Sequence, residues 1–513
     1  MTATFSENPV SSKQTFAARP RAGARKVVVV GSGFAGLSAA CHLAASGFEV
    51  TVLEKNTSPG GRARQFEAEG FVFDMGPSWY WMPDVFEQFF AHFGKKVSDY
   101  YDLRRLDPSY QIFFGKNDAL EVPASMPELE AMFERLEPGS VPNLRKFLRE
   151  AEYKYRVGMG EFVHKPSLSA WEFADWRVVA SLFRLQMLTS MAAHVDGLFK
   201  NQKLRELLKF PVLFLGATPE NTPAMYSLMN HADLVLGTWY PMGGMFKIVE
   251  AMVALAEELG VQIKVNQEVT QIEVVGGAAR RVLTASGKSY AADAVVGAAD
   301  YHHIETKLLE PAHRNYSDRY WATRTMAPSS LIFYLGLNRK LTGLRHHNLF
   351  FDEDFRQHAR EIYDSPQWPE RPLFYVSAPS VTDPSVAPAG CENLFVLIPV
   401  APGLEDTPAL REHYYNLVMQ RLSHLTGQRV GEAVIYRKSF AHKDFVQEYN
   451  SFRGNAYGLA NTLRQTAFLK PRLKSEKVKN LWFAGQLTVP GPGVPPSIIS
   501  GEVVAKSVLS FGL

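Results

Sequence analysis

A glycine-rich segment near the N-terminus has the residue types and spacing of a dinucleotide-binding turn. Gly31, Gly33 and Gly36 form the pattern G-x-G-x-x-G between a β-branched run at 26–30 and a predicted helix at 37–46. Gly31 allows a tight turn, Gly33 lets a pyrophosphate approach the backbone, and Gly36 lets the helix pack closely on the strand. The amides and the positive dipole end of that helix then face the phosphates. The segment therefore predicts the first strand, turn and helix of a Rossmann-type unit.

Glu54 follows the next predicted strand, 48–53, and adds a ribose contact to this prediction. Its carboxylate can accept hydrogen bonds from ribose hydroxyls, and its distance from the glycines is the one at which such units carry an acid. NAD and FAD share this arrangement, so the choice between them depends on the residues that follow. Gly60 and Gly61 let the backbone pass close to a diphosphate, and Arg62 can balance phosphate charge. A surface turn with a solvated arginine is the alternative interpretation.

The segment from Glu54 onward resembles the flavin-binding start of the amine oxidase and phytoene desaturase superfamily. The resemblance rests on Glu54-Lys55, Pro59-Gly60-Gly61-Arg62 and Phe73-Asp74-Met75-Gly76-Pro77-Ser78. It implies FAD as the cofactor, because NAD dehydrogenases do not look like this. The cofactor contacts that it implies in this part of the chain are Glu54, Lys55, Gly61, Arg62, Gly76, Pro77 and Ser78.

The C-terminal segment supplies the far end of the predicted cofactor site. Residues 480–485 predict a buried strand that ends in glycine, and the loop 490–496 leads to a predicted helix that runs from Ser497, as a serine cap, to about Leu509. The helix N-terminus would favour the negative charge that builds near the flavin N1 and C2 carbonyl upon reduction. Relatives often carry an acid after the strand glycine, whereas this chain has a glutamine, which can donate and accept. The contacts implied here are Gly485, Gln486, Val494 and Pro495.

A middle segment completes the FAD-binding domain, which is therefore discontinuous. A helix is predicted from Gly243 to about Leu259 and a strand at 261–265; in this superfamily the valine that follows, here Val269, contacts the adenine through its backbone. Core packing is the competing role of Val269. The predicted fold is α/β, with a Rossmann-type FAD-binding domain in discontinuous segments, a mixed substrate domain and a helical membrane-facing region. The FAD-binding domain takes 26–100, 236–300 and 440–513, the substrate domain takes 101–235 and 301–439, and 1–25 is a disordered tail or targeting segment.

Four further stretches resemble bacterial-type phytoene desaturases: 237–244, 331–337, 346–348 and 378–384. The resemblance extends from Val27 to the C-terminus. It implies FAD-dependent desaturation of phytoene, a long acyclic polyene, toward lycopene-type products by hydride transfer to flavin, with an electron acceptor such as oxygen or quinone. A later-acting carotenoid desaturase, a carotenoid isomerase and a carotenoid oxygenase stay open, because they share these motifs. A non-enzymatic prenyl-binding chaperone is the alternative from another class, and the full set of flavin motifs argues against it.

Asp175 and Arg177 lie near the position where this family has a charged pair proposed for catalysis. The resemblance implies that the pair helps to accept the proton that leaves the polyene, while the flavin is the main catalyst. The alternative is an exposed polar pair beside an apolar helix. No zinc spacing, nucleophile elbow or P-loop is present, and the histidines at 302–303 and 346–347 are adjacent pairs whose side chains point in different directions. No metal site is therefore predicted.

Length, charge and cysteine content limit the remaining possibilities. A chain of 513 residues with 46% hydrophobic and 21% charged residues is long enough for at least two globular domains. A net charge of +3 points to no nucleic-acid partner. Two cysteines are too few for a disulfide framework, which favours a reducing, cytoplasmic compartment. The first 25 residues are rich in Ser, Thr, Ala and Arg, so organelle targeting by this tail stays open.

Residues 171–195 predict peripheral contact with a membrane surface. Aromatic and aliphatic side chains are frequent there, no acid lies between Asp175 and Asp196, and further basic residues follow between 200 and 205. The sequence has no stretch of about 20 apolar residues free of charge, so no spanning helix is predicted. A basic amphipathic helix can lie in an anionic membrane surface, where a polyene is dissolved. A buried helix of the substrate domain is the alternative.

Replacing Phe183 and Leu188 with aspartate tests the membrane prediction. The carboxylates would put charge on the inserting surface, so liposome sedimentation and conversion of liposome-borne phytoene should fall while FAD content stays normal. High salt should release the unaltered protein only partly, because apolar burial adds to electrostatic attraction. A folded variant that still sediments fully with liposomes would contradict membrane contact, and one that fails to fold would favour the buried helix.

Overall fold

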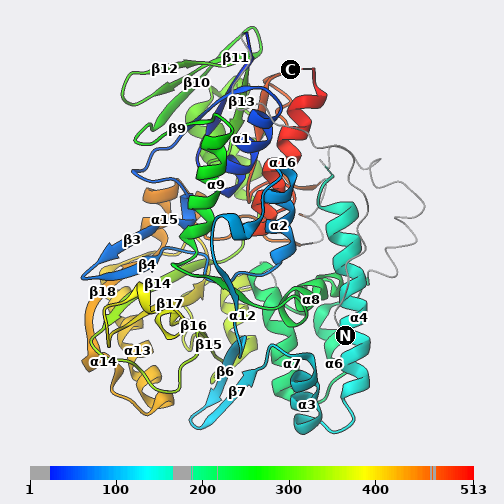
Figure 1. The fold of residues 1–513 in the computed structure, drawn as a ribbon, viewed down its shortest axis with the longest axis vertical. Coiled ribbons are helices and arrows are strands. Elements are labelled where there is room, and N and C mark those ends of the chain that lie inside the picture. The colour runs from blue at the N-terminus through cyan, green and yellow to red at the C-terminus, as the bar shows by residue number, and fades with distance from the viewer. Residues whose placement is uncertain are drawn as a thin grey trace.

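The computed structural model describes residues 23–165, 186–187, 189–215, 218–462, 465 and 469–512. Figure 1 shows a parallel sheet with its helices in the upper part, a mixed sheet at the lower left and a group of helices at the lower right. The first strand and the last helix both lie in the upper part. The two ends of the described chain therefore fold together.

A five-stranded parallel sheet forms the upper part. Its order is β19-β13-β1-β2-β9, and its strands are β1 (Lys26–Val30), β2 (Glu49–Leu53), β9 (Gln262–Lys264), β13 (Ala294–Gly297) and β19 (Leu481–Phe483). Successive side chains of a strand point to opposite faces, so Val27 and Val29 of β1 join one hydrophobic core while Val28 and Val30 join another. Segments from the beginning, middle and end of the sequence thus form a single sheet.

Helices cover one face of this sheet: α1 (Phe34–Ala45), α9 (Phe246–Glu258) and α16 (Val494–Ser510). Helix α1 contacts both of the others. The Ser38 hydroxyl donates to the carbonyl of Ile498 at 2.7 Å, and the Cys41 thiol lies 3.9 Å from the carbonyl oxygen of Met252. The other face packs on a three-stranded sheet of β10 (Val269–Val275), β11 (Ala278–Thr284) and β12 (Ser289–Ala291).

A seven-stranded mixed sheet forms the second part, in the order β18-β14-β17-β16-β15-β6-β7, with β15 and β6 parallel. Its strands are β6 (Tyr110–Gly115), β7 (Asp118–Val122), β14 (Ser329–Leu337), β15 (His347–Phe350), β16 (Phe374–Ser377), β17 (Glu392–Val400) and β18 (Val434–Phe440). One face packs on helix α13 (Pro408–Thr426). The other face presents Tyr334, Tyr375 and Leu397 to the core beneath α1. Because its central strands are buried on both faces, this sheet makes a rigid wall between two cores.

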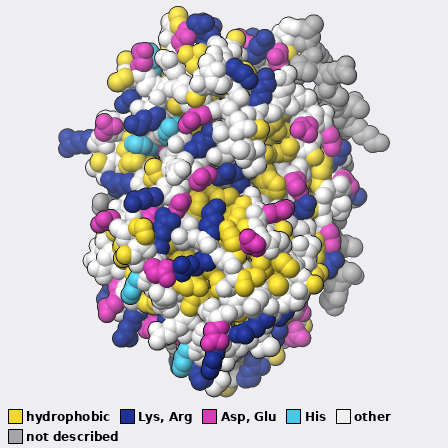
Figure 2. Space-filling view, turned by 90° about the vertical axis from the view of Figure 1, so that its left-hand side faces the viewer, with side chains coloured by type: hydrophobic (Ala, Val, Ile, Leu, Met, Phe, Trp, Pro, Cys, Tyr) yellow, Lys and Arg dark blue, Asp and Glu magenta, His cyan; other side chains and the backbone are white. Residues whose placement is uncertain are grey.

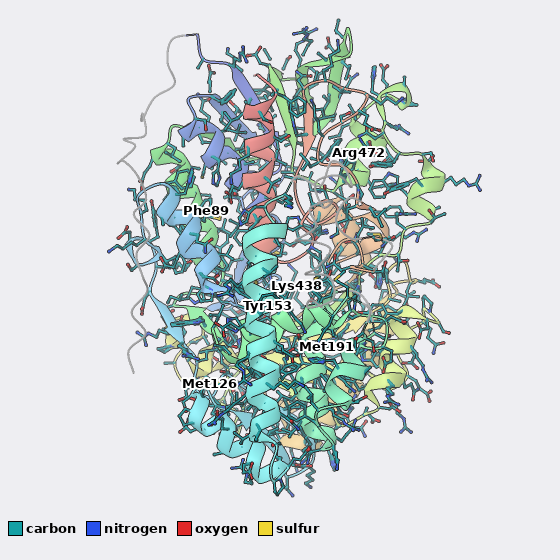
Figure 3. The ribbon with its side chains drawn as sticks, turned by 90° about the vertical axis from the view of Figure 1, so that its right-hand side faces the viewer. Phe89, Met126, Tyr153, Met191, Lys438 and Arg472 are labelled. Atoms are coloured by element: carbon teal, nitrogen blue, oxygen red, sulfur yellow. The ribbon has the colours of Figure 1, made fainter. Side chains whose placement is uncertain are left out.

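Helices form the third part: α3 (Met126–Leu136), α4 (Val141–Val157), α6 (Met191–Asp196), α7 (Gln202–Lys209) and α8 (Leu228–Leu234). Figure 3 shows α4 running along this side of the molecule, with Tyr153 on it and Met191 of α6 beside it. Lys154 is buried on α4 and donates to the Ala224 carbonyl at 3.0 Å and to the Ser227 hydroxyl at 2.9 Å. These bonds fasten α4 to the segment that leads into α8.

Short elements connect the three parts. β3 (Gln65–Ala68) and β4 (Phe71–Asp74) form one ribbon, and β5 (Leu103–Arg105) and β8 (Trp239–Pro241) form another. The further α-helices are α2 (Pro83–His92), α10 (Tyr301–His303), α11 (Asp318–Ala322), α12 (Phe355–Tyr363), α14 (Val430–Ala433) and α15 (His442–Tyr449).

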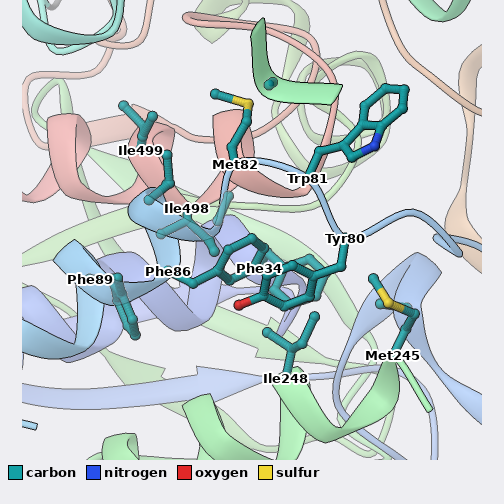
Figure 4. Packing of buried hydrophobic residues seen from close by; sticks show 14 of the residues in the cluster. Phe34, Tyr80, Trp81, Met82, Phe86, Phe89, Met245, Ile248, Ile498 and Ile499 are labelled. Atoms are coloured by element: carbon teal, nitrogen blue, oxygen red, sulfur yellow. The ribbon is translucent and has the colours of Figure 1, made fainter. Parts of the chain in front are cut away.

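The core between α1, α2, α9 and α16 is made of aromatic and aliphatic side chains. Tyr80 stacks on Phe86 with 4.2 Å between ring centroids, and Figure 4 shows both rings beside Phe34 and Ile248. Trp81 follows Tyr80 directly but points away from this cluster. The extended segment that carries these two residues therefore has one side in the core and presents the other to the molecule's interior cavity.

Helix α16 begins earlier than the sequence predicts. It starts at Val494, after Gly493 with its φ of +114°, so the expected serine cap at Ser497 is wrong. Pro495 and Pro496 occupy the first turn, where the fixed φ of proline suits a helix and its missing N–H breaks no hydrogen bond. Two residue types that favour a helix start stand close together here, proline at 495–496 and serine at 497. The helix begins at the prolines.

The predicted membrane segment lies mostly outside the described residues, which omit 166–185 and Leu188. The same holds for nearly all of the N-terminal tail, since residues 1–22 are not described. Within the described part of the chain, no helix is both long enough and apolar enough to cross a membrane.

Gly501→Ala tests the close packing of α16 on α1. A Cβ at this position would overlap the Ala35 carbonyl oxygen and lie 2.7 Å from the Ala39 amide nitrogen, and these backbone atoms cannot rotate away. The substitution should lower the free energy of unfolding by about 3 kcal/mol, the upper range for overpacking. Denaturant unfolding measures this loss. Gly115→Ala is the matched control, because nothing lies within 4 Å of its Cβ position; equal stability of both variants would contradict the packing argument.

Candidate active site

A cavity of about 810 Å³ lies where the three parts of the fold meet. Its lining comes from the glycine turn, the segment 53–63, the start of β10, and the loop and helix start at 484–497. Nearly every residue predicted to contact the cofactor lines this cavity: Gly31, Gly33, Glu54, Lys55, Gly61, Arg62, Gly76, Pro77, Ser78, Val269, Gly485, Gln486, Val494 and Pro495. The fold thus brings together residues that are more than 400 positions apart in the sequence.

The glycines of the turn differ in what surrounds them. Gly31 has a φ of +100°, and its amide donates to the Leu53 carbonyl at 2.8 Å, which closes the turn onto β2. A Cβ on Gly33 would meet no protein atom within 4 Å, so this position opens into the cavity. A Cβ on Gly36 would overlap the Gly31 carbonyl oxygen and lie 3.1 Å from the Ala298 Cβ. Gly36 therefore serves the packing of α1, whereas Gly33 leaves the space that a pyrophosphate needs.

Glu54 is buried and holds the glycine turn in place. Its Oε2 accepts hydrogen bonds from the Ser32 amide at 3.0 Å and the Ser32 hydroxyl at 2.7 Å, while Oε1 accepts from the Asn56 amide and side-chain nitrogen, both at 3.0 Å. The carboxylate lines the cavity beside Val269 and Gln267, where a ribose hydroxyl could exchange with one of the side-chain donors. Ser32 occupies a position of the glycine motif where any residue is allowed, so the motif does not predict its bond to Glu54.

Arg62 is a partly buried cation at the cavity wall. Its Nη2 donates to the Ser451 hydroxyl at 2.8 Å, its guanidinium lies 5.3 Å from the Tyr449 ring centroid, and its Nε has no partner among the described residues. Burial lowers the pKa of Arg62. Burial also disfavours the charged form of nearby Asp300 and so raises its pKa to about 6, although the charge of Arg62 acts to lower it. An incompletely neutralised arginine suits a phosphate group, because a charge away from water needs a partner.

The C-terminal loop and α16 form the other side of the cavity. The amide of Gly485 donates to the Ser500 hydroxyl at 3.0 Å, and the Gln486 side chain donates to Asn455 Oδ1 at 3.1 Å. Because Pro495 and Pro496 have no N–H and the Ser497 amide bonds to Gly493, the first turn of α16 has one amide, that of Val494, without a hydrogen-bond acceptor among the described residues. The helix end therefore offers a single directed donor and the dipole rather than a row of amides.

Lys55 and Val269, for which cofactor contacts were predicted, both line the cavity. The Lys55 ammonium donates to the Gln447 carbonyl at 2.5 Å, which joins β2 to α15. Val269 is buried at the first position of β10, and the nearby amide of Gln267 donates to the Glu54 carbonyl at 2.7 Å. Val269 thus packs in the core and lines the cavity at the same time, so both of its predicted roles are sterically compatible.

The cavity continues from the cofactor residues into an apolar section. Side chains of the helical part and of the mixed sheet line this section: Trp79, Trp81, Met159, Met225, Leu228, Met229, Ile332, Tyr375 and Leu397. Trp79 stacks on His347 with 4.1 Å between ring centroids, and His347 Nδ1 lies 2.6 Å from the Tyr375 hydroxyl. Burial lowers the pKa of His347 well below its usual value, so the imidazole is neutral. The section offers aromatic and thioether surface to a nonpolar guest.

The predicted catalytic pair, Asp175 and Arg177, lies outside the described residues. Their catalytic role therefore stays a prediction. Within the described part of the chain, no group of three or more His, Cys, Asp and Glu side chains could hold a metal ion. Further residues at the cofactor side of the cavity matched no sequence pattern, and these are Ser32, Asp300, Tyr449 and Asn461. They come from separate segments of the chain, so only the three-dimensional structure shows that they lie at the cavity.

Comparisons with known proteins agree with this geometry. The family described as flavin containing amine oxidoreductase matches residues 34–509. The chain is 44% identical to a carotenoid 3,4-desaturase of Haloarcula japonica, over 94% of this chain and 98% of that protein. It is 33% identical to a zeta-carotene-forming phytoene desaturase of Myxococcus xanthus, over 95% and 94%. A putrescine oxidase structure matches with a TM-score of 0.61 at 14% identity, over 95% of this chain and 99% of that one, which shows a shared fold.

Gly33→Val tests the pyrophosphate position. The valine side chain would enter open space rather than protein, so the protein should fold normally but lose FAD, because its methyl groups occupy the volume that the pyrophosphate needs. The flavin absorbance of the purified protein, with far-ultraviolet circular dichroism as the folding control, measures this outcome. A folded variant with stoichiometric FAD would contradict the placement.

Proposed function

Because the chain belongs to the flavin-containing amine oxidoreductase family, among the bacterial-type carotenoid desaturases, we propose that it desaturates a long acyclic carotenoid, with C3–C4 as the favoured position. The protein is an FAD-dependent oxidoreductase. The motifs that imply phytoene as the substrate are compatible with this function but do not select phytoene over a later intermediate.

The single observation that carries this proposal is the continuity of the cavity. One wall has the glycine turn, Arg62 and the start of α16, and the same space extends between Trp79, Met225 and the mixed sheet. A nonpolar chain in the apolar section would therefore reach the flavin ring without crossing water. Burial of the guest among aliphatic and aromatic side chains supplies the binding free energy, since a polyene has no heteroatom to bond.

The chain's own residues position the substrate and exclude water. Bound FAD supplies the acceptor for the hydride that leaves the polyene. The aromatic faces of Trp79, Trp81 and Tyr375 can stabilise the positive charge that develops on the carbon chain, because a desolvated ring attracts a cation. Asp175 and Arg177 remain the proposed pair for the departing proton.

Sequence identity favours desaturation at the C3–C4 position over desaturation of phytoene. The relative described as a 3,4-desaturase is 44% identical over nearly the whole chain, and the relative that forms zeta-carotene from phytoene is 33% identical. Phytoene desaturation is the second candidate, because both relatives cover the apolar section as well as the cofactor residues. A carotenoid isomerase or oxygenase would share the same cavity.

We further propose that the enzyme works at a membrane surface from the cytoplasmic side and passes its electrons to oxygen or a quinone. Its substrate is dissolved in lipid, which requires contact with a bilayer. Figure 2 shows hydrophobic side chains gathered on one face of the molecule, with both basic and acidic side chains among them. The apolar part of this face suits contact with lipid.

Product analysis tests the substrate and the reaction together. The gene should be expressed in two sets of cells, one that accumulates phytoene and one that accumulates later acyclic carotenoids. The pigments are then separated, and the molecular mass of each is measured by mass spectrometry. We expect loss of two hydrogens per step and a longer chromophore, chiefly in the second set. Conversion confined to phytoene would establish the second candidate. A product of unchanged mass would indicate an isomerase, a gain of oxygen would indicate an oxygenase, and either result would overturn the proposal.

A further inference from the structure

Lys470 is a buried lysine beside the loop that leads into α16. The residue is 4% exposed, and its ammonium donates to the Pro490 carbonyl at 3.0 Å. It lies 2.5 Å from the point where Gly491 would carry a Cβ, so it touches the backbone of the loop itself. Pro490 and Gly491 line the cavity. Only this short stretch of loop therefore separates the ammonium from the cofactor space.

Asn461 lies on the same side of the loop and also lines the cavity. It is 7% exposed, and its Oδ1 has no hydrogen-bond partner among the described residues. That oxygen lies 3.3 Å from the same Gly491 point, so the side chains of Lys470 and Asn461 both lie against Gly491. Two buried polar side chains with spare bonding capacity are costly in a protein interior unless a ligand or a neighbouring charge compensates them.

No described acid neutralises Lys470. Burial lowers its pKa to about 7, and no carboxylate, histidine or tyrosine of the described residues shifts it further. None of the ion pairs in the described part of the chain includes it. When protonated, Lys470 is thus a positive charge close to the cavity, with only the loop at Pro490 and Gly491 between them.

We propose that Lys470 is a positioning residue for the flavin: its unneutralised ammonium, held behind Pro490 and Gly491, favours the negative charge that FAD gains on reduction. The amide of Val494 and the positive end of the α16 dipole lie three residues farther along the same loop and act in the same direction. The proposal rests on the FAD site but not on the identity of the carotenoid. It predicts a shifted reduction equilibrium even without substrate.

The test is the midpoint potential of the FAD-bound protein between pH 6 and pH 9, measured without substrate. In Lys470→Met, the equilibrium constant for reduction should fall at least tenfold at pH 6, which is about 30 mV for a two-electron couple. The difference from the unaltered protein should shrink as the pH rises through about 7, because Lys470 then loses its proton. Lys470→Arg should keep the higher potential at every pH, since arginine stays charged.

Asn461→Asp separates the electrostatic effect from support of the loop. The new carboxylate would lie close enough to neutralise Lys470, which keeps its bond to Pro490, so the potential should fall as in Lys470→Met. Lys477→Met is the matched control, because it removes an exposed lysine of the same segment and should leave the potential unchanged.

Two results would overturn the proposal. One is an unchanged potential in Lys470→Met. The other is a lowered potential in Lys470→Met with an unchanged potential in Asn461→Asp, which would reduce Lys470 to a support of the loop. If Lys470→Met does not retain FAD, Lys470→Arg and Asn461→Asp decide the question by the same measurement. Failure of the carotenoid assignment would leave all of these potentials unaffected.

Discussion

Gly501 of α16 lies against the backbone of α1 so closely that no side chain fits between them. The Ser38 hydroxyl crosses the same contact to the Ile498 carbonyl. Helix α1 begins at the phosphate turn and α16 begins at the loop beside Lys470, so this contact sets the width of the cofactor cleft. β19, which precedes α16 in the chain, pairs with β13 at the edge of the parallel sheet, and from this edge the chain returns over α1.

The cavity divides into two chemical environments that share one space. At the cofactor end, Glu54 is buried and Arg62 is partly buried. Both form hydrogen bonds with neighbouring side chains, and Arg62 Nε has no partner among the described residues. At the other end, tryptophans and methionines leave few polar atoms exposed to a guest. Electrostatic interactions are stronger in a cavity shielded from water than in water itself. The small number of charged groups near the cleft can therefore bind phosphates and shift the electron affinity of a flavin.

The family relation explains why a similar fold serves different substrates. A putrescine oxidase has the same architecture at 14% identity, although its named substrate is a small amine. The cofactor part repeats because the dinucleotide imposes the same turn and helix ends on every chain that binds it. The substrate section of the cavity has no such requirement, and its residues come from the helical part and the mixed sheet. Function is therefore decided there rather than by the fold.

By itself, the sequence determined the strand, turn and helix around Gly33, the acid at Glu54, the FAD cofactor and the discontinuous course of the cofactor sheet. The turn and the acid depend on residues close together in the chain, whose spacing has a direct geometric meaning. FAD and the discontinuous sheet were implied by motifs that resemble a known flavoprotein family. Local rules failed where two of them competed, as at the start of α16, where the prolines and not Ser497 mark the first turn. The tertiary structure alone decided the cavity, the contact of Arg62 with Ser451 and the approach of both Lys470 and Asn461 to Gly491. Such contacts join segments whose separation in the sequence carries no information about their separation in space, because only packing of the whole chain brings them together.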